Sequence, residues 1–291
     1  MSNRRYPISI AELNTWREEH GVTAVEAQER FLQYVVLECI AAGVGRREII
    51  LKGGNALRFV YRSLRSTIDL DFTATRAIDD NESAIRTILD QSMSRSLRRH
   101  GVKTRVQRLE RRPKRRPNSN CPTYLATIAY QMPGDRHFAA FESYEKSLPQ
   151  VVKLEISLND VVCEVTRVAL DTSGASSLQV CTLEDILAEK LRAILQQAPR
   201  NRHRPQDVFD IARFTRTDGT RIDKAKVSEF LIRKAVARGI HPRKTSFNND
   251  LKARSAVGYD ELEQTTGEEF IPFESAWAEV IQFVASLDIP G

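Results

Sequence analysis

The sequence predicts an α/β core followed by a helical C-terminal lobe, and three observations lead to this fold class. Short β-branched apolar runs and helical apolar spacing both occur before residue 182. From residue 182 to the end the spacing is helical only, with long segments near 222–238 and 273–287. The 291 residues are too many for one small domain. We therefore expect a core with N-terminal helices over 1–175, a helical lobe over 176–291, and a site in the cleft between them.

The core is expected to begin with helices and to continue as a sheet. Residues 9–20 and 24–42 have helical spacing, and a capping box formed by Thr23 and Glu26 starts the second helix. Residues 48–51 form a β-branched apolar run that ends in Lys52, which is typical of a buried strand. Further on, the pattern predicts a helix over 81–100 and strands over 102–109, 122–132, 151–158 and 161–168.

Gly53 and Gly54 end this first strand and open a helix, because apolar residues recur at helical spacing after them. A Gly-Gly turn at the start of a helix leaves backbone N–H groups at the positive end of the helix dipole. Phosphate oxygens can approach such groups without meeting a Cβ atom. The two glycines therefore predict a phosphate-binding turn.

The next segment, 67–75, alternates between apolar and polar residues. A strand here would place Ile68, Leu70 and Phe72 on one face and Asp69 and Asp71 on the other. Paired carboxylates suit hard cations such as Mg²⁺, including two-metal phosphoryl-transfer sites. A lone D-x-D on a strand is most often a solvated face. The order of strand, K-G-G, helix and D-x-D favours a metal and nucleotide site instead.

A second group of polar residues lies downstream, on a helix that a capping box at Thr182 begins. Asp185, Glu189, Lys190 and Arg192 make up the polar part of this helix, and Asp207 and Asp210 follow a basic loop. Taken alone, they would be an ordinary charged helix surface and an N-cap. After K-G-G and D-x-D in this order, they become candidate site residues.

These motifs resemble those of the AbiEii-like (MenT-type) nucleotidyltransferase toxins of the polymerase-β-like superfamily. The family's K-G-G-T-A-L-R and R-x-S-x-D-L-D-F motifs match 52–58 (KGGNALR) and 65–72 (RSTIDLDF). The chain departs from them at Asn55, where Thr is usual, and at Thr67, where Ser is usual; Thr67 keeps a hydroxyl group. Asp185 and Lys190 resemble the family's D-x4-K motif, and 206–211 (QDVFDI) is similar to R-D-x-x-D-L. The resemblance covers roughly residues 45–215 and implies a polymerase-β-like nucleotidyltransferase core.

The resemblance also implies an activity. The chain would be a toxin that transfers a nucleoside monophosphate from a nucleoside triphosphate (NTP) to an RNA acceptor, expected to be the 3′ end of tRNA. The transfer would release pyrophosphate and arrest growth, and a cognate antitoxin would neutralise the toxin. Asp69 and Asp71 would hold Mg²⁺ or Mn²⁺, and the nucleotide would contact Lys52, Gly53, Gly54, Thr67 and Asp185. The expected catalytic residues are Asp69, Asp71, Glu155, Lys190, Asp207 and Asp210.

Glu155 enters this set because the superfamily takes a third carboxylate from a neighbouring strand. The segment 151–158 alternates, with Lys153 and Glu155 on its polar face. The alternative is that both are exposed strand residues without a catalytic role.

The net charge of +6 indicates a polyanionic partner. Basic residues gather at 108–117, where prolines forbid a helix, and at 200–204. Such runs are usually solvated surface. Because both are expected to flank the site, we assign them to sequence-independent contacts with an RNA backbone. The candidate RNA-binding residues are Arg111, Arg112, Arg115, Arg116, Arg202 and Arg204.

Other classes of protein are disfavoured. No run reaches the ~18 apolar residues of a membrane span, and the N-terminus lacks the apolar segment of a signal peptide. We therefore expect a cytoplasmic protein without a membrane partner. The four cysteines are widely spaced, which indicates reduced thiols, and the five scattered histidines give no case for histidine-based metal binding.

Two rival functions remain open. A small-molecule nucleotidyltransferase of the aminoglycoside-modifying type would use the same metal site but would not need the basic segments. A non-catalytic nucleic-acid-binding protein would gain nothing from paired carboxylates near phosphates, because like charges repel.

Overall fold

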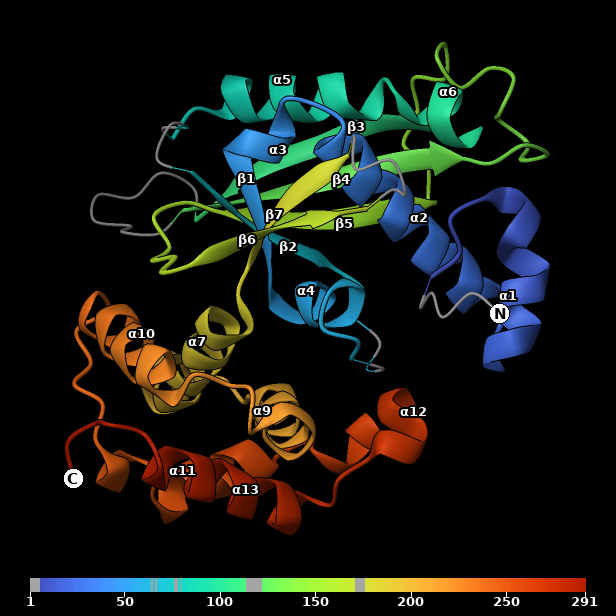
Figure 1. The fold of residues 1–291 in the computed structure, drawn as a ribbon. Helices are drawn as coiled ribbons and strands as arrows, with labels where there is room; N and C mark the ends of the chain where they lie inside the picture. Colours follow the sequence, from blue (N-terminus) through green and yellow to red (C-terminus); the bar gives the residue numbers. More distant parts are fainter. Residues whose placement is uncertain are drawn as a thin grey trace. The chain divides into compact units, whose positions relative to one another are not determined.

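Figure 1 shows the computed structural model, which describes residues 6–63, 65, 67–75, 78, 80–113, 122–170 and 176–291. The chain divides into two compact units. Unit 1 comprises Met1–Ser63, Thr67–Asp160 and Thr166–Val180, and unit 2 comprises Leu64–Ser66, Val161–Val165 and Cys181–Gly291.

Unit 1 begins with helices whose ends follow from the sequence. A short 3-10 turn, η1 (Ile10–Glu12), leads into α1 (Leu13–His20), and α2 (Ala24–Ala41) follows. The side chain of Thr23 accepts a hydrogen bond from the backbone N of Glu26 at 3.1 Å, as the capping box predicts. The second half of α2 is buried, which makes it the central helix of this unit.

The segment 81–100 forms two helices instead of the single helix expected. These are α5 (Glu82–Met93) and α6 (Ser96–His100), and the short α3 (Gly45–Glu48) precedes β1. The hydroxyl of Thr104 contacts the carbonyl of Met93 at 3.1 Å and the hydroxyl of Ser96 at 2.8 Å. The bond to the Met93 carbonyl satisfies a backbone group at the break that a continuous helix would have paired internally.

Within the described residues, seven strands form one sheet in the order β3-β4-β5-β2-β1-β7-β6. β2 pairs with β1 in antiparallel and with β5 in parallel orientation. Leu51, Phe72 and Ile156 lie on the buried apolar face of this sheet, where α2 contacts β5. The strands are β1 (Ile49–Lys52), β2 (Leu70–Ala74), β3 (Lys103–Arg112), β4 (Thr123–Gln131), β5 (Val151–Ser157), β6 (Val165–Ala169) and β7 (Ser177–Cys181).

Two strand expectations were wrong in part. The strand expected over 161–168 is confined to β6, because the backbone N of Cys163 donates to the Asp185 carboxylate at 2.6 Å instead of joining a ladder. In addition, β7, which pairs in parallel with β1, was not predicted from the sequence. Conversely, the first half of the basic segment 108–117 is not a loop, since β3 stays paired with β4 as far as Arg112 and Thr123.

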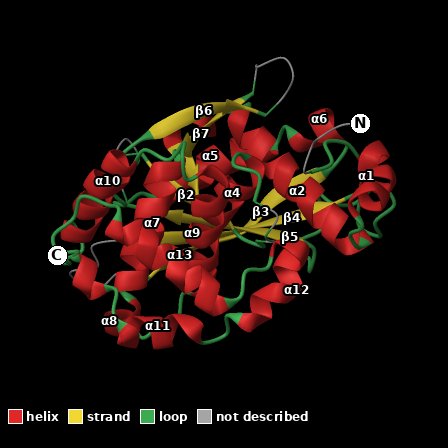
Figure 2. Cartoon of the chain, turned by 60° about the horizontal axis from the view of Figure 1, so that its bottom comes forward, coloured by secondary structure: helices red, strands yellow, loops and turns green. Residues whose placement is uncertain are grey.

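Within residues 182–291, all of which the structure describes, the regular elements of unit 2 are helical (Figure 2). Thr182 starts the first of them by accepting a hydrogen bond from the backbone N of Asp185 at 3.4 Å. In the described part of the chain, no helix is both long and apolar enough to cross a membrane. The elements are α7 (Leu183–Leu195), α8 (Gln197–Arg200), α9 (Pro205–Asp218), α10 (Lys224–Val236), η2 (Lys244–Ser246), α11 (Asn249–Ala256), η3 (Asp260–Leu262), α12 (Glu263–Thr266), η4 (Gly267–Glu269) and α13 (Phe273–Ala285).

Candidate active site

Three charged residues form a row across neighbouring strands of unit 1. Lys52 of β1 pairs with Asp71 of β2, and Asp71 pairs in turn with Glu155 of β5. Residues paired in this way point to the same face of a sheet, and adjacent strands lie about 4.8 Å apart. The structure therefore brings together the lysine and two of the three carboxylates that the sequence singled out.

Gly53 brings the start of a helix up to this row. It is the first residue of α4 (Gly53–Phe59) and has a φ of 69°, which glycine adopts most readily. A Cβ atom added at Gly53 would overlap Oδ2 of Asp71 and lie 3.0 Å from Cβ and Cγ of that residue. The absence of a side chain at this position thus lets the carboxylate approach the helix start.

Asp69 does not lie on the strand, contrary to expectation. β2 begins at Leu70, and its paired residues begin at Leu70 and Asp71. Ile68 is 68% exposed, so it does not share the buried face with Leu70 and Phe72. The carbonyl groups of the segment 67–69 bond to side chains instead of a neighbouring strand. Asp69 is exposed beside the row.

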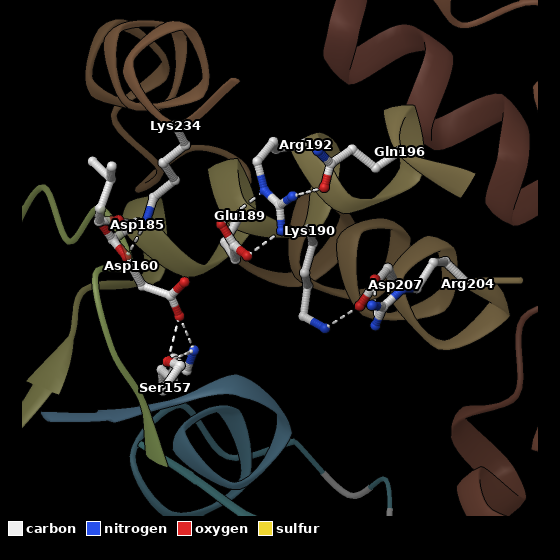
Figure 3. Close-up of polar contacts among 12 residues, drawn as sticks. Ser157, Asp160, Asp185, Glu189, Lys190, Arg192, Gln196, Arg204, Asp207 and Lys234 are labelled. Carbon is white, nitrogen blue, oxygen red and sulfur yellow. Dashed lines mark hydrogen bonds and ion pairs between the residues drawn. The ribbon is translucent and has the colours of Figure 1, made fainter. Parts of the chain in front are cut away.

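Lys52 contacts a serine and an aspartate of unit 1. Its Nζ atom donates to Oγ of Ser157 at 2.7 Å and forms an ion pair with Asp160. Ser157 also donates to Asp160, and Figure 3 shows these two side chains facing each other. Asp160 was not among the predicted site residues. An acidic residue directly after the strand that carries Glu155 was the available signal.

Unit 2 holds a separate cluster built on α7 and α9. The Lys190 ammonium lies 2.7 Å from Oδ1 of Asp207 and 2.8 Å from Oδ2 of Asp210. Figure 3 shows Lys190 pointing to Asp207. Arg65 makes two hydrogen bonds to Asp210, at 3.0 and 2.9 Å. Arg65 was not among the predicted site residues, although it is a charged residue of the segment 65–72 that resembles the family motif.

Burial and neighbouring charges shift the pKa values in this cluster in opposite directions. Burial alone would lower the pKa of Lys190, but the negative charges of Asp207 and Asp210 raise it above its usual value. Burial alone would raise the pKa of Asp210, but the charges of Arg65 and Lys190 lower it to about 2. Lys190 therefore carries its positive charge in a buried environment.

Asp185 is occupied by other groups of unit 2. Its Oδ1 accepts the backbone N–H of Cys163 at 2.6 Å, and its Oδ2 lies 2.9 Å from Nζ of Lys234. Lys234 also donates to the carbonyl of Val161. Figure 3 shows Asp185 beside Lys234, apart from the contact between Lys190 and Asp207. Asp185 thus holds the segment 161–165 against α10.

The candidate RNA-binding arginines have different surroundings. Arg111 bonds through Nε and Nη2 to Asp80, so its charge is largely compensated within unit 1. Arg112 and Arg202 are exposed, and Arg204 lies 3.9 Å from Asp207. Arg115 and Arg116 lie outside the described residues.

A further group, Glu38, Cys39 and His100, has the ligand types and proximity of a metal site. However, the Glu38 carboxylate already bonds to Arg99, His100 and Ser176. Burial, followed by the charge of Glu38, raises the pKa of the Cys39 thiol to about 12, which disfavours the thiolate that binds metals. These contacts identify a buried ion-pair network.

Comparisons with known proteins identify the family and the fold. The profile of the family "Nucleotidyl transferase AbiEii toxin, Type IV TA system" matches residues 35–280. The fold is similar to that of MenT4, a nucleotidyltransferase toxin from Mycobacterium tuberculosis, at 17% identity and a TM-score of 0.59, covering 97% of this chain and 91% of that one.

A weaker likeness links the chain to JHP933 from Helicobacter pylori, at 16% identity and a TM-score of 0.42, covering 96% of this chain and 92% of that one. No curated protein matches the chain. The profile match spans well over half of the residues and agrees with the motifs seen in the sequence. The chain therefore belongs to the AbiEii family of nucleotidyltransferase toxins.

Proposed function

We propose that this nucleotidyltransferase transfers a nucleoside monophosphate from an NTP to an RNA acceptor, the 3′ end of a tRNA. Growth arrest would follow from the blocked RNA end, and a cognate antitoxin would neutralise the toxin. The activity belongs in the cytoplasm, where NTPs and tRNA occur together. The row of Lys52, Asp71 and Glu155 beside the start of α4 carries this proposal.

The donor set fits a hard divalent cation. Asp71 and Glu155 are neighbours on one sheet face, and Asp69 lies two residues before Asp71. All three offer carboxylate oxygens, which Mg²⁺ and Mn²⁺ prefer. We assign the metal to Asp69 and Asp71. A bound Mg²⁺ or Mn²⁺ would supply positive charge against the phosphate oxygens.

The protein's own groups would do the remaining work. We assign the triphosphate contacts to the backbone at Gly53 and Gly54. The Thr67 hydroxyl, which the sequence predicted to contact the triphosphate too, is buried and is not accessible to it. Lys52, which Asp160 and Ser157 hold, would neutralise charge on the triphosphate. Glu155 takes the proton of the acceptor hydroxyl, whose oxygen attacks the α-phosphorus as pyrophosphate leaves.

In unit 2, Lys190 neutralises charge that develops on the phosphates, and Asp207 and Asp210 keep its ammonium charged and oriented. Because both oxygens of Asp185 are bonded within unit 2, we assign it an indirect role in which it fixes the helix that carries Lys190.

The test is a transfer assay with purified protein, Mg²⁺, each labelled NTP in turn, and total RNA. We expect label to enter RNA with the wild type and to be lost with Asp71→Asn. Asp90→Asn, the same change at an exposed aspartate of α5, is the matched control and should retain activity. Label on a small-molecule acceptor instead of RNA would favour the aminoglycoside-type alternative, and no transfer with any NTP would contradict the proposal.

A further inference from the structure

The segment that carries Asp69 lacks the backbone support that β2 gives to Asp71. Strand pairing begins at Leu70 with β5 and at Asp71 with β1. The three preceding carbonyl groups, those of Thr67, Ile68 and Asp69, therefore precede the ladder. Backbone groups in such a segment need other partners to hold one conformation.

Two buried amide side chains provide these partners. Gln33 of α2 donates through Nε2 to the carbonyls of Thr67 and Ile68, both at 2.8 Å. Asn55 of α4 donates through Nδ2 to the carbonyls of Thr67 at 3.3 Å and Asp69 at 2.6 Å. Each amide thus uses both of its N–H groups, and the two share the Thr67 carbonyl.

These amides are placed at an energetic cost. Gln33 is 4% exposed and Asn55 is 0% exposed. Their other polar atoms, Oε1 of Gln33 and Oδ1 of Asn55, have no hydrogen-bond partner among the residues that the structure describes. A buried acceptor without a partner is unfavourable. Both amides donate all of their N–H groups to this one segment, so their placement indicates a role in fixing it.

We propose that Gln33 and Asn55 are positioning residues that hold the Asp69 carboxylate beside Asp71 in the geometry the divalent cation requires. This inference rests on the proposed function, because it takes Asp69 as a cation ligand. A threonine hydroxyl at position 55 would have one donor and could not bond to both carbonyls, whereas the Asn55 amide bonds to both.

The experiment compares Gln33→Met and Asn55→Leu with the wild type in three measurements. These are Mn²⁺ binding followed by electron paramagnetic resonance, hydrogen exchange of the peptide that contains residues 67–71, and kcat and KM for transfer. The matched control is Gln131→Met, which removes a buried amide at the end of β4 that bonds to Tyr130 and Gln150. Asn55→Thr keeps one donor and is the conservative variant.

We expect both test variants to exchange faster at 67–71 and to bind Mn²⁺ about 10-fold more weakly, with kcat falling about 10- to 100-fold and the KM for RNA changing little. Asn55→Thr should fall between Asn55→Leu and the wild type. Wild-type exchange and Mn²⁺ affinity in the test variants, or equal losses in Gln131→Met, would overturn the inference. If the variants weaken Mn²⁺ binding while the wild type transfers no nucleotide, the proposed function fails and the positioning role stands.

Discussion

At the scale of single residues, close approaches between charged groups and backbone hold the candidate site residues within each unit. Asp71 lies against Gly53, Lys52 is held by Asp160, and Lys190 is held by two aspartates. Each contact constrains which side chain the position tolerates. Two predictions follow from these constraints.

Replacing Gly53 by alanine should displace the Asp71 carboxylate, because the new Cβ would overlap Oδ2. We expect transfer activity to fall at least ~10-fold and the free energy of unfolding to fall by about 1–3 kcal/mol, since a non-glycine residue would adopt a positive φ. Gly239→Ala is the control: Gly239 has a similar φ of 72°, but an added Cβ would meet nothing within 4 Å. Equal loss of activity in both variants would show that backbone strain, and not Asp71, is responsible.

Variants at Lys190 distinguish a role of its buried charge in stability from a role in nucleotide transfer. Lys190→Met leaves Asp207 and Asp210 with less compensation, so the free energy of unfolding should fall by about 3 kcal/mol. Adding Asp207→Asn removes one of the excess negative charges and should restore part of that loss in a urea titration. Turnover should remain low in the double variant, since the cation is still missing. Recovery of turnover together with stability would make Lys190 a purely structural residue.

At the scale of elements, buried polar groups join helices and strands that sequence periodicity treats separately. Glu38 of α2 bonds to Arg99 and His100 of α6 and to Ser176, which precedes β7. Although burial opposes it, the hydrogen bonds from His100, Arg99 and Ser176 lower the pKa of Glu38 to about 2. The network therefore stabilises unit 1 only while Glu38 is ionised.

The stability of the wild type should reflect this pKa. A lowered folded-state pKa gives a contribution that is complete above the ordinary glutamate pKa of 4.5 and is lost as the pH falls through about 2. The shift corresponds to about 3 kcal/mol. Glu38→Gln should therefore be less stable than the wild type at pH 7, and the difference should shrink between pH 4.5 and 2 in urea titrations. Glu18→Gln, on an exposed side chain of α1, should show no such convergence. A constant difference across that range would contradict the assignment.

At the scale of the whole molecule, the net charge is +6, but only some of the basic side chains are exposed and able to contact a polyanion. Arg111 is engaged with Asp80, whereas Arg112 and Arg202 are exposed. The charge available to a polyanion therefore differs from the charge counted along the sequence. A test of RNA binding should leave Arg111 in place.

Replacing Arg112, Arg115 and Arg116 by alanine should weaken RNA binding and flatten its dependence on salt. Each lost contact with a single-stranded phosphate lowers the slope of log affinity against log salt by about 0.7. The control replaces Arg221, Lys224 and Arg243, which are exposed in unit 2, and removes the same net charge. The measurement is filter binding of RNA to both variants over a series of salt concentrations. Equal slopes in both variants would identify the 108–117 segment as ordinary solvated surface.

Several local features of the fold could be predicted from the sequence. The strand ending at Lys52, the helix opened by Gly53 and the capping boxes at Thr23 and Thr182 were all predicted and confirmed. These features depend on residues within a few positions of each other, so local pattern is sufficient. The extent of β2 was predicted less well, because the pairing of a strand depends on its neighbours and not on its own alternation.

The sequence by itself determined which chemistry the chain offers: paired carboxylates, a glycine turn that opens a helix, and a lysine placed among aspartates. The tertiary structure alone decided which of these groups meet. Glu155 pairs with Asp71, Asp160 holds Lys52, Arg65 holds Asp210, and Gln33 supports the segment before Asp69. The physical reason is that strand register and burial bring together residues distant in sequence, and only these contacts determine whether a charged group is compensated, exposed or held in place.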